Sequence, residues 1–340
     1  MNVGGANPYS NGLVFAGFNQ DQGCFACGLE NGFRVYNCDP LKEKERHDFP
    51  DGGFGAVEML FRCNYLALVG GGKNPKYPKN KVVIWDDVKN EVVLELSFDT
   101  DVRGVRLRRD RVVVILESLL HVFTFTQQPQ PLHVFESGYN PNGICCLCPS
   151  SHNSLLAFPG RVAGHVNITN LANTDRPPFD INAHNSGLSC LALNSDGTIM
   201  ATTSNKGTLV RVFDTGTGDK LHELRRGSNP ARIYCLNFSH DSNNICVSSD
   251  HGTIHVFHLH QQKQKHSKLW PSKYLNNRHS FCRFQLPSNS KTVGPCLCAF
   301  GHDKDTVIVV CADGSYYKYR FDAKGESARE HYALFLAMTD

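Results

Sequence analysis

The stretch Gly207-Thr208-Leu209-Val210-Arg211-Val212-Phe213 returns in related form 45 residues later, as Gly252-Thr253-Ile254-His255-Val256-Phe257. Each copy begins with a glycine, which suits a tight turn, and continues in β-branched and aromatic residues, which favour a strand. A turn and a strand that recur at an interval of about 40–45 residues are typical of propeller blades. The pair therefore predicts a repeat fold built from β-strands.

Related segments occur along the rest of the chain. They are Asn31-Gly32-Phe33-Arg34-Val35-Tyr36, Lys81-Val82-Val83-Ile84-Trp85-Asp86, Ser118-Leu119-Leu120-His121-Val122-Phe123, Gly164-His165-Val166-Asn167-Ile168 and Gly314-Ser315-Tyr316-Tyr317-Lys318-Tyr319. Other apolar runs, at 65–69, 111–116, 154–158 and 306–311, supply strands between them. The seven units predict an all-β fold, a WD40-like seven-bladed β-propeller that forms one domain over residues 1–340. A β-sandwich is the competing all-β class, but it does not explain the even spacing.

The sequence also allows predictions for the two ends of the chain. We expect residues 13–19 to pair into the last blade and so close the ring. Amphipathic helical periodicity is scarce, and only residues 326–338 could hold a helical turn or two.

Bulk composition narrows the class of protein. The chain has 35 basic and 32 acidic residues, a net charge of +3, so any anion site must be local. Residues 1–12 lack the basic start and apolar run of a signal peptide, and the 14 cysteines then fit reduced thiols in the cytosol. Cys145 and Cys148 have the spacing of a zinc half-site, but strand alternation points their thiols to opposite faces, which favours a core role.

Motifs for catalysis are weak. The run Gly70-Gly71-Gly72-Lys73 lacks the spacing of a phosphate-binding loop, and no Gly-x-Ser-x-Gly elbow is present. The histidines His133, His165 and His184 show no metal-ligand spacing, and we predict no catalytic residue, metal or cofactor. The chain is expected to be a binding protein and not an enzyme.

Two basic features stand out beside the repeats. Leu224-Arg225-Arg226-Gly227 lies between the two copies quoted above, and in extended backbone its arginines point to opposite faces. Each guanidinium could then serve one repeat, with the planar fork that suits phosphate. The segment 258–278 contains five Lys or Arg, no acidic residue and an apolar group, Leu269, Trp270, Tyr274 and Leu275. Such a long loop is either functional or a solvated surface loop.

These features resemble the PROPPINs, seven-bladed propellers that bind phosphoinositides and carry a [Phe/Leu]-Arg-Arg-Gly signature. The wider resemblance runs from about residue 13 to residue 332 and is closest to the WIPI-3/WIPI-4 branch of metazoan autophagy proteins. Its carrying segments include 17–21, 66–72, 83–87, 157–160 and 311–314. The resemblance implies that phosphatidylinositol 3-phosphate and phosphatidylinositol 3,5-bisphosphate bind in two pockets on blades five and six.

Carried over residue by residue, the resemblance implies two sets of phosphoinositide-binding residues. The first comprises Arg225 with Thr203, Ser204, Lys206, Thr208, Arg211 and His184. The second comprises Arg226 with Ser248, Ser249, His251, Thr253 and His255. His251 stands where the preceding repeat has Lys206, and an imidazole is mostly uncharged above its pKa of about 6.5. The segment 258–278 matches the family's membrane-contacting loop in blade six.

The resemblance also implies partners and a location. A cytoplasmic monomer would be recruited to phagophore or preautophagosomal and endolysosomal membranes, and an autophagy lipid-transfer protein would dock on the early blades near the lysine-rich loop 73–81. A solvated hairpin tip explains those lysines equally well. A lipid-independent protein-interaction scaffold is the main alternative function. Nucleic acid is not an expected partner, because it would need an extended basic stripe.

Overall fold

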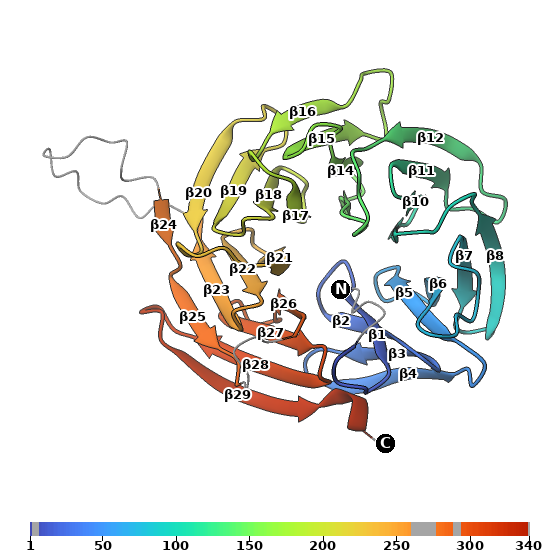
Figure 1. Cartoon of the computed structure of the whole chain (residues 1–340), viewed down its shortest axis with the longest axis horizontal. Coiled ribbons are helices and arrows are strands. Elements are labelled where there is room, and N and C mark those ends of the chain that lie inside the picture. The colour runs from blue at the N-terminus through green and yellow to red at the C-terminus, as the bar shows by residue number, and fades with distance from the viewer. Residues whose placement is uncertain (2–6, 260–276, 288–293, 339–340) are drawn as a thin grey trace, which may run out of the picture.

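A computed structural model describes residues 1, 7–259, 277–287 and 294–338 of the chain. In these residues the strands form seven sheets, antiparallel except for one strand pair at the rim, arranged as the blades of a ring around a central axis (Figure 1). Each blade begins with a strand at the axis and ends with a strand at the rim. The predicted all-β, seven-bladed propeller is confirmed.

The first four blades follow one another along the chain. Blade 1 contains β1 (Leu13–Phe18), β2 (Cys24–Leu29), β3 (Gly32–Asn37) and β4 (Lys42–Asp48). Blade 2 contains β5 (Gly53–Met59), β6 (Tyr65–Gly71), β7 (Lys81–Asp86) and β8 (Glu91–Ser97). Blade 3 contains β9 (Gly104–Arg108), β10 (Arg111–Ile115), β11 (Leu119–Thr124) and β12 (Pro131–Glu136). Blade 4 contains β13 (Cys146–Leu147), β14 (Leu155–Pro159), β15 (His165–Asn170) and β16 (Phe179–Asn182).

The remaining blades hold the residues singled out in the sequence. Blade 5 contains β17 (Leu188–Leu193), β18 (Ile199–Ser204), β19 (Leu209–Asp214) and β20 (Lys220–Arg225). Blade 6 contains β21 (Ile233–Phe238), β22 (Asn244–Ser249), β23 (Thr253–His258) and β25 (Cys282–Gln285). Blade 7 contains β26 (Cys296–Phe300), β27 (Thr306–Cys311), β28 (Ser315–Phe321) and β29 (Ser327–Leu334). A further strand, β24 (Asn277–His279), pairs in parallel with β20 at the rim of blade 5.

Burial follows the position of a strand within its blade. The second strands β2, β22 and β27 are buried along their whole length, because both of their faces pack against neighbouring blades. The rim strand β8 alternates exposed and half-buried residues, as its Glu-Val-Val-Leu-Glu-Leu-Ser sequence predicts. The core is therefore a series of apolar layers between adjacent blades, one of which joins blades 5 and 6.

Ring closure differs from the expectation. Residues 13–18 form the inner strand of blade 1, paired with β2, because blade 7 already has four strands from the C-terminal part of the chain. The ends of the chain meet through side chains instead. The Tyr316 hydroxyl donates to the Cys38 carbonyl at 2.6 Å, and the Asn11 amide donates to the Ala312 carbonyl at 2.9 Å.

The helical turns considered for residues 326–338 are largely replaced by a strand. Ser327–Leu334 form β29, and only a single 3-10 turn, Phe335–Ala337, follows. Pairing with the exposed edge of β28 overrides the helix propensity of this segment. Among the described residues, no helix has the length and apolar character required to cross a bilayer.

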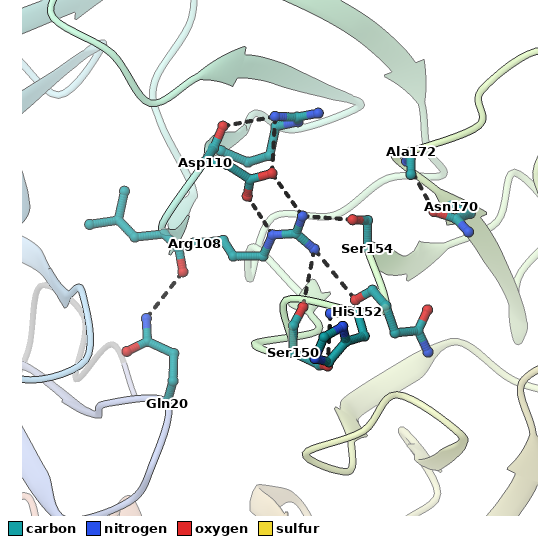
Figure 2. A network of polar contacts seen from close by, with 11 residues as sticks. Gln20, Arg108, Asp110, Ser150, His152, Ser154, Asn170 and Ala172 are labelled. Atoms are coloured by element: carbon teal, nitrogen blue, oxygen red, sulfur yellow. Dashed lines mark hydrogen bonds and ion pairs between the residues drawn. The ribbon is translucent and has the colours of Figure 1, made fainter.

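Polar side chains tie blade 3 to other blades (Figure 2). Arg108 is buried between blades 3 and 4, where it donates to Asp110 at 2.6 Å and to the Ser154 hydroxyl at 2.6 Å. From blade 1, the Gln20 amide donates to the Leu107 carbonyl at 3.2 Å. These ties join blade 3 to blades 1 and 4.

Candidate functional site

Strand β20 sends the two signature arginines to different blade boundaries. Leu224 is buried in the core that blades 5 and 6 share, so alternation turns its neighbour Arg225 to the opposite face, toward blade 4. Arg226 follows the end of β20, and its guanidinium lies 3.3 Å from the His251 ring of blade 6. Two consecutive residues therefore reach two neighbouring boundaries of the ring.

The 4/5 pocket is the boundary region that contains Arg211, Arg225, Ser204 and His184. Alternation along β18 and β19 turns Ser204 and Arg211 to the side where Met200 and Phe213 pack against blade 4. The Arg211 guanidinium donates to Glu223 at 2.9 Å and to the Ala183 carbonyl at 2.7 Å.

A cavity of about 340 Å³ adjoins Arg211. It is lined by Phe179, Asp180, Ile181, Asn182, Ala183, Arg211, Phe213, Gly218 and Lys220. Lys220 also donates to Glu223, at 2.9 Å. Burial opposes ionisation of Glu223, but the hydrogen bond and charge of Lys220, together with Arg211, outweigh it and lower the Glu223 pKa. The pocket thus contains cations and an internal counter-charge.

His184 lies on the buried side of the boundary between blades 4 and 5. It is buried, and its Nε2 lies 3.0 Å from the Thr202 hydroxyl. Burial, and next the positive charge of Arg211, lower the pKa of His184 to about 4. At neutral pH His184 is therefore an uncharged hydrogen-bonding group and adds no positive charge to the pocket.

The 5/6 pocket is the boundary region that contains Arg226, Ser249, His251 and His255. Arg226 is buried, and it donates to the Gly207 carbonyl at 2.7 Å and to the Asn229 carbonyl. Burial lowers the pKa of Arg226, although the charge of Asp250 opposes this. Gly207 has φ +63°, and a Cβ there would clash with the Ala231 carbonyl, so only glycine presents this acceptor correctly.

Two side chains of blade 6 face Arg226 from strands β22 and β23. His255 is buried, with its Nδ1 3.1 Å from the Ser280 hydroxyl, and burial followed by Arg226 and Arg283 lowers its pKa to about 4. Ser249 is fully buried, and its hydroxyl has no hydrogen-bond partner among the described residues. A buried hydroxyl without a partner costs free energy and is ready to bind an incoming acceptor.

The structure separates two of the expected residues from the pockets assigned to them. Thr203 points away from Arg225, and its hydroxyl lies 2.8 Å from that of Ser189. Ser248 points toward blade 7, where it donates to the Cys296 carbonyl at 2.7 Å. The reason is strand alternation, because neighbouring residues of β18 and β22 face opposite blades.

The turns of the two repeats hold the remaining expected residues. Lys206 is exposed in the turn before β19, and the Thr208 carbonyl accepts the Arg226 backbone N–H at 2.9 Å. In blade 6, the Thr253 hydroxyl lies 2.7 Å from the Gln285 carboxamide oxygen. Of these residues, Thr208 contacts Arg226 through its backbone carbonyl.

The sequence did not single out three further residues at the candidate site, Thr202, Glu223 and Arg283. Alternation applied to residues 201–204 would have placed Thr202 with His184, and Glu223 lies two residues before Arg225 on the same face of β20. Arg283 pairs with His255 across β23 and β25, and nothing in the sequence marks that register.

The strand that follows residues 260–276 pairs with a strand of the candidate site. Leu269, Trp270, Tyr274 and Leu275 lie outside the described residues. The described part that follows forms β24, whose His279 is the backbone partner of Arg225 on β20. The segment predicted to contact membranes therefore ends beside the signature arginines.

The chain is a seven-bladed β-propeller with arginines at two neighbouring blade boundaries. The PROPPIN family model matches residues 12–281. The chain is 37% identical to autophagy-related protein 18e of Arabidopsis thaliana, covering 91% of this chain and 84% of that protein. It is 34% identical to SVP1-like protein 2 of Pichia angusta, covering 88% and 87%. The solved structure of Kluyveromyces lactis Hsv2 superposes with a TM-score of 0.79 at 27% identity, covering 95% of this chain and 99% of that one. The chain belongs to the PROPPIN family of phosphoinositide-binding, autophagy-related propellers.

Proposed function

We propose that this protein binds phosphatidylinositol 3-phosphate and phosphatidylinositol 3,5-bisphosphate, one headgroup in the 4/5 pocket and one in the 5/6 pocket. The observation that carries the proposal is the divergence of Arg225 and Arg226 to two boundaries on the same part of the rim. Hydrogen bonds to charged groups contribute roughly 1.5–3 kcal/mol each. Two headgroups held on one bilayer would reinforce each other, because the second binding step becomes intramolecular.

The segment 258–278 would complete membrane attachment. Leu269, Trp270, Tyr274 and Leu275 would enter the interfacial region, each large side chain contributing roughly 1.5–3 kcal/mol. The lysines of the segment would stay at anionic headgroups, at about 1 kcal/mol each. The pairing of β24 with β20 supports this arrangement, since it ties the end of the segment to the strand that carries Arg225.

Liposome flotation with the Arg225→Thr/Arg226→Thr double variant tests the pockets. Each single change should weaken recruitment to vesicles that contain either phosphoinositide, and the double change should abolish it. Arg46→Thr is the matched control, because Arg46 is an exposed arginine of blade 1 paired with Asp48. A double variant that floats like the wild type would refute the assignment and favour a lipid-independent scaffold.

A second variant separates membrane insertion from headgroup recognition. Leu269→Ser combined with Trp270→Ser should reduce flotation but leave binding of a soluble short-chain phosphoinositide nearly intact. If both assays respond equally, or neither does, the segment does not act as an insertion loop.

At autophagic membranes, phagophore or preautophagosomal and endolysosomal, the bound protein would recruit autophagy proteins, including a lipid-transfer protein. The loop 73–81 is the proposed docking region. In this loop Lys76 pairs with Asp51 at 2.6 Å and Lys81 pairs with Glu95 at 2.7 Å, so Lys73 and Lys79 are better placed to meet a partner. Lys73→Ala with Lys79→Ala should reduce co-precipitation of the lipid-transfer protein while flotation stays unchanged. Unchanged co-precipitation would leave the loop as a solvated hairpin tip.

A further inference from the structure

Three metal-ligating side chains meet at the rim between blades 1 and 2, on the far side of the ring from blades 5 and 6 (Figure 1). Glu45 and His47 lie two residues apart on β4 and so share a face, and Asp87 follows β7. One ligand atom from each lies within 4.8 Å of the other two. The His47 Nε2 is 2.6 Å from the Asp87 carboxylate.

The surrounding side chains fix these groups in place. The His47 ring stacks on Phe33, with ring centroids 4.7 Å apart, and its edge lies against Trp85 at 5.6 Å. The Trp85 indole N–H lies 3.3 Å from the Asp87 carboxylate. A ring held by stacking and a carboxylate held by an indole are the kind of outer support that orients metal ligands.

The charges of the cluster favour a cation. Two carboxylates face a single imidazole. One imidazole nitrogen and two carboxylate oxygens suit Zn²⁺, which takes N and O ligands at about 2.0–2.2 Å and accepts water as a fourth. Among the described residues this is the one group of three such side chains.

We propose that Glu45, His47 and Asp87 form a binding site for a divalent transition-metal cation of the zinc class. The ion takes the place of the hydrogen between His47 Nε2 and Asp87, and the imidazole ligates as the neutral tautomer with its proton on Nδ1. The metal joins β4 of blade 1 to the end of β7 in blade 2, and this site is separate from the phosphoinositide pockets.

Trp85 offers a local reporter. The chain has two tryptophans, so a full-length Trp270→Phe variant leaves Trp85 as the single emitter. Co²⁺, a paramagnetic stand-in for Zn²⁺, should quench Trp85 in a saturable, one-site manner, and added Zn²⁺ should reverse the quenching. In the same background, His47→Gln and Glu45→Gln should each weaken Co²⁺ binding by about tenfold or more.

The matched control is His165→Gln on blade 4. His165 Nδ1 also lies 2.6 Å from a carboxylate, that of Asp180, but the pair has no third ligand within the described parts of the chain. This variant should bind Co²⁺ like its parent. Circular dichroism verifies that each variant is folded. The proposal is overturned if the folded parent shows no saturable quenching, or if Glu45→Gln quenches like the parent, since a simple His47–Asp87 ion pair does not need Glu45.

Discussion

The 4/5 and 5/6 pockets occupy equivalent places in consecutive blades, yet their charges differ. Arg211 and His255 correspond, each facing the preceding blade beside a buried phenylalanine, Phe213 or Phe257. The rim-strand partner of Arg211 is Glu223, whereas the partner of His255 is Arg283. A headgroup entering the 4/5 pocket must compete with an internal carboxylate, while the 5/6 pocket presents a buried guanidinium. The same repeat thus gives one site whose cations face an internal carboxylate and one site with a preformed cationic group.

The largest expected effect concerns acid stability. His184 and His255 each have a pKa of about 4 in the folded protein, against about 6.5 when unfolded. A histidine with a lowered pKa stabilises the fold fully above pH 6.5, and this contribution is lost as the pH falls to 4. Each of these histidines should therefore lower the free energy of unfolding by roughly 3 kcal/mol between pH 6.5 and pH 4. Urea unfolding between pH 7 and pH 4 should show a shallower loss for His255→Gln and for His184→Gln than for the wild type.

Single arginine changes should then distinguish the pockets. Arg226→Met should raise the pKa of His255 and leave that of His184 unchanged, and Arg211→Met should do the reverse. Histidine chemical shifts followed by NMR would report both values. If either change moved both histidines equally, the pockets would be coupled electrostatically and their comparison as separate sites would fail.

The next prediction concerns Glu223, the counter-charge of the 4/5 pocket. Glu223→Gln removes the carboxylate that Arg211 and Lys220 share, so both cations become available to a phosphate. Removing one negative charge a few ångströms away should tighten binding of a soluble phosphoinositide in this pocket by about tenfold. Titration calorimetry in an Arg226→Thr background isolates the 4/5 pocket.

The control for this change lies in blade 2. Glu95 pairs with Lys81 at 2.7 Å in a similar rim-strand setting, so Glu95→Gln removes a carboxylate of the same kind far from either pocket. It should leave affinity unchanged. An unchanged affinity in Glu223→Gln would mean that the Arg211–Glu223 pair does not restrict the site.

The sequence predicted the fold well because the repeat and the burial pattern have one cause. Each blade must cover the next, so the third strand of each blade repeats the same turn and apolar alternation, as at Gly207 and Gly252. Ring closure was predicted wrongly, because residues 13–19 read equally well as a first inner strand or as a closing strand. The outcome depends on how many strands the last blade already has.

The candidate site was predicted in outline and not in detail. The arginine pair and its alternation were readable, since two adjacent residues of a strand must diverge. Thr203 was grouped with Arg225 by the family resemblance, and only the register shows which of Thr202, Thr203 and Ser204 face blade 4. The return of β24 to β20 is a long-range pairing that no local pattern encodes.

The smallest effect concerns Ser249, and its two consequences should have opposite signs. The Ser249 hydroxyl is buried without a hydrogen-bond partner among the described residues, so Ser249→Ala removes a desolvation cost and should stabilise the free protein by about 1 kcal/mol. The same change should weaken phosphoinositide binding in the 5/6 pocket several-fold, because a headgroup oxygen loses a donor beside Arg226. Ser248→Ala is the control, since Ser248 donates to Cys296 and should lose stability without altering affinity. Urea unfolding gives the stability of both variants, and calorimetry gives their affinity for a soluble phosphoinositide. If Ser249→Ala lowers stability and leaves affinity unchanged, the hydroxyl serves the core of blade 6, and the 5/6 pocket is less open to a ligand than its geometry indicates.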